Sequence, residues 1–150
     1  MKYTEKISNQ LNDLLVKNYD AEKGYLNAAE QVDSERLKLF FNERAAERSQ
    51  FAKELRTEIL RYGQIPEDSG SFKGVVHRNW MTLKALFSSN DEEAILEETI
   101  RGEKKSLEEY NEILSCDDTL PPSIEALLVK QKDAILSAIN TAKLHEELVS

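Results

Sequence analysis

The sequence predicts an all-α protein whose four long helices form one antiparallel bundle. Apolar residues recur at three- and four-residue steps in four segments of the chain. Runs of Asp, Ser, Asn, Gly and Pro separate these segments and are typical of helix ends. The chain has 150 residues, which is enough for one domain with a sizeable core, so we expect residues 1–150 to form a single domain.

The first two helices, at about 7–29 and 37–62, are expected to form a hairpin. Between them, Asp33 or Ser34 is a suitable N-cap, and Gly63 is a natural end for the second helix. So short a connection makes the helices antiparallel neighbours. The predicted inward-facing residues are Ile7, Leu11, Leu14, Asn18, Glu22, Tyr25 and Ala29, followed by Leu37, Phe40, Phe41, Arg44, Arg48, Phe51, Leu55, Ile59 and Tyr62.

Residues 64–90 are expected to form a crossover between the second and third long helices. Turn formers dominate residues 64–71, and a short extra helix is predicted from about Phe72 to Phe87. Residues 88–91 can cap the third long helix, and the prolines in 117–123 suit the start of the fourth. The predicted inward-facing residues are Leu96, Ile100, Glu103, Leu107, Tyr110 and Leu114, followed by Ile124, Leu128, Gln131, Ile135, Ala138 and Ala142.

Polar residues interrupt all four apolar seams near mid-length and predict a polar belt in the bundle core. Inward-facing carboxylates at this level are how many four-helix bundles hold two metal ions. Tyr19, Tyr25 and Tyr110 are candidates to donate hydroxyl hydrogen bonds to the belt. The candidate metal ligands are Glu22, Glu47 and Glu103, and the whole belt comprises Asn18, Glu22, Arg44, Glu47, Arg48, Glu103 and Gln131.

The helix order, with its long central connection, is that of ferritin-like bundles. The chain also resembles a bacterial family of unknown function whose members are four-helix-bundle proteins grouped with the ferritin-like superfamily. The resemblance spans about Ile7 to Leu114 and implies a fold without an agreed activity. The segments that carry it are Asp20-Ala21-Glu22-Lys23-Gly24-Tyr25, Gln50-Phe51-Ala52-Lys53-Glu54-Leu55, Glu67-Asp68-Ser69-Gly70-Ser71, His77-Arg78-Asn79-Trp80-Met81 and Arg101-Gly102-Glu103.

The residue types in the belt favour ion pairs over a metal site. A ferritin-like di-iron site takes a Glu from each of two helices and a Glu-x-x-His from each of the other two. Neither 43–46 nor 47–50 ends in histidine, and the fourth helix offers Gln131. Arg44 and Arg48 are always charged, so they would repel a dication and could neutralise the belt carboxylates themselves. We predict a structural belt with no catalytic, cofactor or metal site; a degenerate di-iron or other di-metal site and ordinary solvent-facing charges are the alternatives.

The composition and charge of the chain predict which partners and which compartment it has. The chain carries 28 acidic and 20 basic residues, for a net charge of −8, and has no basic run, so we expect no nucleic-acid partner. No stretch approaches the ~20 apolar residues of a membrane span or begins like a secretion signal. The single cysteine, Cys116, has no intramolecular partner and suits a reducing compartment. These features predict a cytoplasmic protein without membrane association.

We therefore expect a non-enzymatic protein that acts through contacts with itself or with another protein. Two alternatives remain open. One is a di-metal oxidase or metal-storage protein of the ferritin type, and the other is a protein that binds a small molecule in the bundle core or beneath the crossover.

Overall fold

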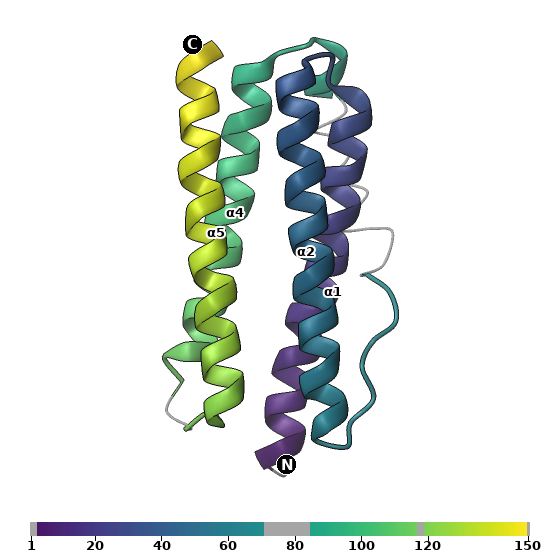
Figure 1. Cartoon of the computed structure of the whole chain (residues 1–150), viewed down its shortest axis with the longest axis vertical. Helices are drawn as coiled ribbons and strands as arrows, with labels where there is room; N and C mark the ends of the chain where they lie inside the picture. The colour runs from purple at the N-terminus through teal and green to yellow at the C-terminus, as the bar shows by residue number, and fades with distance from the viewer. Residues whose placement is uncertain (1–2, 71–84, 117–118, 150) are drawn as a thin grey trace. The chain divides into compact units, whose positions relative to one another are not determined.

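The computed structural model describes residues 3–70, 85–116 and 119–149, and the regular structure in these residues is helical. The prediction of an all-α protein is confirmed. The chain divides into two compact units, Met1–Trp80 and Met81–Ser150. Each unit contains a hairpin of two long helices, α1 with α2 in the first and α4 with α5 in the second (Figure 1). The packing of all four helices into one bundle stays a prediction.

The first hairpin consists of α1 (Tyr3–Gln31) and α2 (Glu35–Arg61). Ser34 is the N-cap of α2, and its hydroxyl oxygen accepts a hydrogen bond from the Leu37 backbone N–H at 3.3 Å. Gly63 follows α2 with φ of 73°, and the next N–H, that of Gln64, donates to the Ile59 carbonyl at 3.2 Å. This is the glycine-ended closure that the sequence predicts, since glycine adopts this backbone conformation without a steric penalty.

Apolar residues along α1 and α2 form the core of the first hairpin. The rings of Phe40 and Phe41 meet edge to face with their centroids 5.3 Å apart, and Tyr25 stacks on Phe41 at 6.0 Å. Such aromatic pairs add to the stabilisation from buried area. The predicted seams are confirmed by the buried residues Ile7, Leu11, Leu14, Ala29, Leu37, Phe40, Phe41, Phe51, Leu55 and Ile59.

The second hairpin consists of α4 (Glu92–Leu114) and α5 (Pro122–Val149). Asp91 is the N-cap of α4, and its carboxylate accepts from the Ala94 N–H at 3.0 Å. Proline at the first position of α5 costs no hydrogen bond, because that N–H has no partner within the helix. The predicted seams are again buried at Leu96, Ile100, Glu103, Tyr110, Ile124, Leu128, Gln131, Ile135, Ala138 and Ala142.

The segment after α2 returns along the first hairpin (Figure 1). The Asn12 side chain donates to the Ile65 carbonyl at 3.1 Å and accepts from the Glu67 N–H at 2.9 Å. The Tyr19 hydroxyl donates to the Glu67 carbonyl at 3.1 Å and accepts from Arg56 at 2.8 Å. The segment is therefore fastened to α1 by side chains, a feature that the sequence did not predict.

The predicted crossover helix from Phe72 to Phe87 lies mostly outside the described residues. Residues 85–88, at the described end of this segment, are helical. Among the helices described for this chain, none combines the length and the apolar character needed to cross a lipid bilayer.

Candidate functional site

A buried pair of polar residues joins α1 to α2 near the middle of both helices. Arg48 Nη1 donates to Asn18 Oδ1 at 2.8 Å, and both side chains are buried. Asn18 Nδ2 donates in turn to the Leu14 carbonyl at 2.9 Å, which orients the amide oxygen toward the arginine. The Arg48 guanidinium also lies 5.7 Å from the centre of the Phe51 ring. A buried guanidinium needs such acceptors and π-faces, since it cannot lose its charge.

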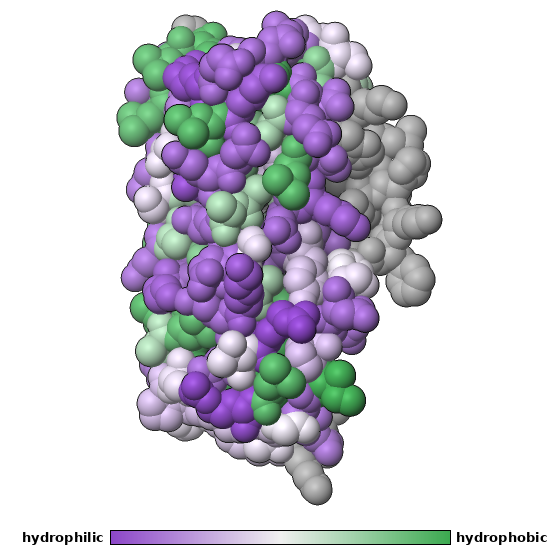
Figure 2. Space-filling model, turned by 45° about the vertical axis from the view of Figure 1, so that its right-hand side comes forward, coloured by the Kyte–Doolittle hydropathy of each residue, from purple (hydrophilic) through white to green (hydrophobic). Residues whose placement is uncertain are grey.

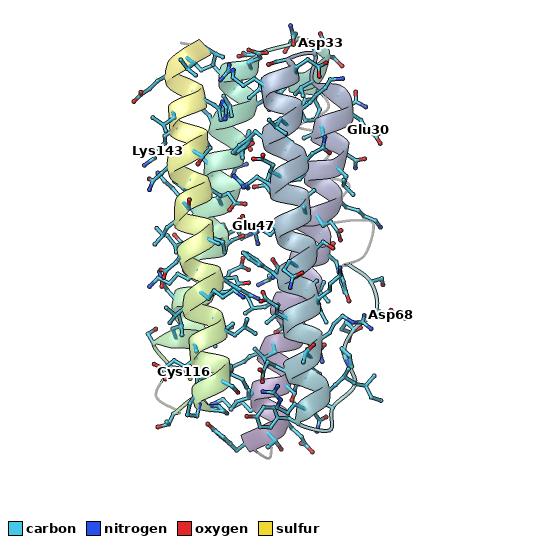
Figure 3. The ribbon with its side chains drawn as sticks, viewed as in Figure 1. Glu30, Asp33, Glu47, Asp68, Cys116 and Lys143 are labelled. Atoms are coloured by element: carbon cyan, nitrogen blue, oxygen red, sulfur yellow. The ribbon has the colours of Figure 1, made fainter. Side chains whose placement is uncertain are left out.

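A second arginine lies one turn earlier on α2. Arg44 Nε is 3.4 Å from Glu47 Oε1 in an i, i+3 ion pair, and both side chains are half-buried. Glu47 lies near mid-length of α2 (Figure 3). The Arg44 guanidinium is 5.3 Å from the centre of the Phe40 ring. Arg44 Nε finds no hydrogen-bond acceptor in the part of the chain that the structure describes, and the Glu47 ion pair and the Phe40 ring contact both stabilise the guanidinium charge.

The polar pair of the second hairpin is uncharged. The Tyr110 hydroxyl donates to Gln131 Oε1 at 2.6 Å, which joins α4 to α5, and both side chains are buried. Glu103 lies two turns before Tyr110 on the same face of α4 and is also buried. This hairpin therefore buries a hydroxyl, an amide and a carboxylate at the level where the sequence predicts polar residues.

The residues of the predicted belt divide between the two hairpins. Asn18 contacts Arg48, and Arg44 contacts Glu47. Glu22 is half-buried, and its place in an ion-paired core stays a prediction.

Two of the tyrosines that the sequence offers as hydroxyl donors have recorded hydrogen bonds. Tyr110 donates to the amide oxygen of Gln131, a residue of the predicted belt. The Tyr19 hydroxyl donates to the Glu67 carbonyl, in the segment that follows α2. Local sequence patterns held no signal for the Tyr110–Gln131 pair, because it joins residues on different helices.

The three candidate metal ligands come from both hairpins, Glu22 and Glu47 from the first unit and Glu103 from the second. The Glu47 carboxylate contacts the Arg44 cation, which would repel a dication at that position. No three His, Cys, Asp or Glu side chains are grouped to hold a metal ion within residues 3–70, 85–116 and 119–149.

The chain has two histidines. His145 lies near the end of α5, and His77 is outside the described residues. The sequence offers no Glu-x-x-His pair at mid-length of α2 or α5, as such a site requires.

The α4–α5 hairpin has a depression of about 310 Å³ near the start of α4 and the end of α5. Small-molecule sites are usually lined by apolar and aromatic side chains with a few polar groups. This depression has the opposite lining, with one apolar residue among charges of both signs: Glu97, Ile100, Lys104, Lys143, Glu146 and Glu147. Its lining is therefore not typical of a small-molecule site.

Large apolar side chains remain exposed on both hairpins. In the view of Figure 2 they are distributed among hydrophilic residues. Ile65, in the segment that Asn12 fastens, is the most exposed of them at 87%. The others that the structure describes are Tyr3, Leu26, Leu39 and Leu60 in the first unit, and Val129, Leu136, Leu144 and Leu148 on α5.

Comparison with known families places the chain in one of them. The family described as "Domain of unknown function (DUF2383)" matches residues 6–116. The chain belongs to the DUF2383 family. The matched region includes most of α1 and all of α2 and α4, and it ends at Cys116, a half-buried free cysteine just after α4 (Figure 3). Helix α5 lies beyond the region that the DUF2383 family matches. Comparison of the chain with curated proteins found no match.

Proposed function

We propose that this DUF2383 protein is non-enzymatic and acts through contacts with itself or with another protein. The observation that carries the proposal is the pairing of buried polar groups inside each hairpin, Arg48 with Asn18 and Tyr110 with Gln131. A guanidinium stays protonated at any physiological pH, and amides do not titrate, so these groups suit structural support better than proton transfer. Exposed apolar side chains on both hairpins supply surfaces for contact.

We further propose that the two hairpins pack as an antiparallel four-helix bundle with ferritin-like connectivity. The order of hairpin, long connection and hairpin supports this arrangement. Small-angle X-ray scattering tests it, because a compact monomer of this length has a radius of gyration of about 15 Å. A markedly larger value for the monomer, with two maxima in the pair-distance distribution, would contradict the bundle.

Iron binding separates the structural belt from its main alternative, a degenerate di-metal site for oxidation or storage. The apoprotein is incubated anaerobically with ferrous iron, and bound iron is measured by elemental analysis. We expect no more iron than in a control that carries Glu22→Gln, Glu47→Gln and Glu103→Gln. About two irons per chain, lost in that control, would establish the di-metal alternative.

Protein contact is tested by mass and by capture. Sedimentation velocity over a range of concentrations reports self-association, and cross-linking in an extract of the source cells reports other partners. We expect at least one specific complex. A chain that stays monomeric at every concentration and yields no specific cross-linked partner would contradict the proposed function.

A further inference from the structure

The segment that follows α2 is held on α1 by its main chain. We call residues 64–70 the strap. Asn12 Nδ2 donates to the Ile65 carbonyl at 3.1 Å, and Asn12 Oδ1 accepts from the Glu67 N–H at 2.9 Å. The Tyr19 hydroxyl donates to the Glu67 carbonyl at 3.1 Å. The groups that α1 binds here, carbonyls and an N–H, are present in almost every residue of any protein.

The side chains in the middle of the strap are exposed. Ile65 is 87% exposed, and residues 67–69 are exposed as well. Figure 3 shows Asp68 on the outer side of the first hairpin. Because these side chains lie in solvent and the main chain makes the contacts, the hold on the strap depends on the path of the chain and little on its sequence.

The binding groups on α1 are spaced for an extended chain. Asn12 binds on either side of Pro66, and Asp20 lies against Gly70. From 12 to 20 the helix rises about 12 Å, and from 66 to 70 an extended chain rises about 13 Å. A Cβ atom at Gly70 would overlap the Asp20 carboxylate, so glycine is the residue that fits there.

Arg56 of α2 orients the Tyr19 hydroxyl toward a carbonyl. Arg56 Nη1 donates to the Tyr19 hydroxyl oxygen at 2.8 Å. A guanidinium is always a donor, so the hydrogen of the hydroxyl points away from it, and here it points to the Glu67 carbonyl. Arg56 is therefore a positioning residue, and the hydroxyl is ready to donate to any carbonyl that lies at this place.

The strap is held weakly enough to be replaced. The hydrogen bonds from Asn12 and Tyr19 are exposed, and each such bond changes an equilibrium constant by roughly tenfold or less. Segments held by a few exposed hydrogen bonds open locally at low cost in free energy. The strap keeps its place because it is tethered and so has a high effective concentration. A segment of another protein can displace it when its side chains bury more surface than those of the strap.

We propose that this side of α1, with Asn12 and Tyr19 as the main-chain-binding residues, is a binding site for an extended segment of another protein. The strap occupies the site until that partner replaces it. The inference rests on the proposed function, which is contact with another protein, and it names the site and the chemistry of the partner. A helical partner segment does not fit, because its carbonyls and N–H groups are already paired within the helix.

The partner segment shares the features by which the strap is bound. Its first residue offers a carbonyl, as Ile65 does, and its third offers both an N–H and a carbonyl, as Glu67 does. The second residue needs no N–H, since Pro66 has none, so proline is accepted there. The sixth residue, in the place of Gly70, is glycine.

One substitution, placed in two molecules, tests the site with opposite expected signs. In the full chain, Glu67→Pro removes the N–H that Asn12 accepts and leaves Asn12 and Tyr19 unchanged. The strap is then weakened, so the free peptide of residues 64–70 should bind this variant roughly 3- to 10-fold more tightly than it binds the wild-type chain. In the peptide, the same change removes the donor of the ligand and should weaken binding by a similar factor.

Binding is measured by NMR of the isotope-labelled full chain, with the peptide acetylated and amidated at its ends. The peptide should shift the Asn12 side-chain amide and the main-chain amides of residues 12–20, with a dissociation constant on the order of 1 mM for the Glu67→Pro chain. Gly70→Val, which sets a side chain against Asp20, weakens the strap by a second route and should act in the same direction. No shift up to about 10 mM peptide in either variant would overturn the proposal.

Two asparagines separate this site from general peptide affinity. Asn12→Ala in the Glu67→Pro chain removes the amide that binds the main chain and should weaken peptide binding roughly tenfold or more. Asn42→Ala, at an exposed position of α2, should leave binding unchanged. Circular dichroism checks that each variant keeps its helical content. Equal effects of the two asparagine variants would overturn the proposal, and so would a peptide that binds equally well with proline in place of Glu67.

The remaining outcomes separate this inference from the proposed function. A partner captured equally well by the wild-type and Asn12→Ala chains would overturn the inference and leave the proposed function in place. A wild-type dimer that Asn12→Ala dissociates would show that the occupant is the strap of a second copy, which overturns the assignment to another protein.

Discussion

The two hairpins use different chemistry to join their helices at mid-length. The first uses a buried cation, Arg48, which donates to the Asn18 amide, and the second uses two neutral groups, Tyr110 and Gln131. Burying a charge costs several kcal/mol unless its partners compensate, whereas a neutral hydrogen-bonded pair costs far less to bury. Loss of the Arg48 cation should therefore destabilise the chain more than loss of the Tyr110 hydroxyl from the second hairpin, which also buries the Glu103 carboxylate.

The largest effect is expected when the cation of the first hairpin is removed. Arg48→Ala takes away the hydrogen bond to Asn18 and the packing on Phe51, and it leaves the groups that face the arginine without their buried partner. We expect the free energy of unfolding to fall by about 3–5 kcal/mol, as measured by urea denaturation. Lys53→Ala, at an exposed position of the same helix, should change it by less than about 0.5 kcal/mol. Equally small losses of unfolding free energy from Arg48→Ala and Lys53→Ala would show that the buried cation does not set the first hairpin apart.

The neutral pair of the second hairpin should respond less. Tyr110→Phe removes only the hydroxyl and leaves Gln131 Oε1 buried without that donor, which should cost about 1–3 kcal/mol. Tyr62→Phe at a half-buried position is the control. A loss from Tyr110→Phe that exceeds the loss from Arg48→Ala would reverse the comparison.

Features of the fold that depend on neighbouring residues could be predicted from the sequence. The helix ends at Ser34, Gly63 and Asp91 follow from local side-chain and backbone chemistry, and the buried seams follow from helical periodicity. Periodicity also predicted which face of a helix a residue lies on, but not how deeply its side chain is buried. Glu22 shares the face of Asn18, yet it is half-buried where Asn18 is buried.

Contacts between distant residues could not be predicted in the same way. Tyr110 and Gln131 are 21 positions apart, and Asn12 and Glu67 are 55 apart. Each pairing depends on how two elements are rotated and shifted against each other, and no short sequence pattern records that geometry.

The first hairpin also holds the segment that follows α2 through hydrogen bonds from the Asn12 side chain to Ile65 and Glu67. Asn12→Ala removes two exposed hydrogen bonds to the backbone of residues 65 and 67, so the expected loss is about 1 kcal/mol. Hydrogen exchange gives the specific readout. The Glu67 amide should exchange faster in the variant, because it loses its acceptor, while amides at the centre of α4 should keep their rates. Unchanged exchange at Glu67 would show that Asn12 does not hold the segment in solution.

The smallest effect should be the same in both hairpins. Gly24 lies within α1 and Gly102 within α4, and a Cβ atom added at either position would meet no atom within 4 Å. Alanine restricts the unfolded chain more than glycine and favours the helix, so Gly24→Ala and Gly102→Ala should each stabilise by about 0.5–1 kcal/mol in urea denaturation. Gly63→Ala is the opposite control, since φ of 73° there strains any residue with a Cβ. Because the glycine gain comes from backbone entropy and not from side-chain partners, equal gains at Gly24 and Gly102 would show that helix formation contributes equally to the stability of the two hairpins. Unequal gains would show that the two hairpins already differ in how their helices form.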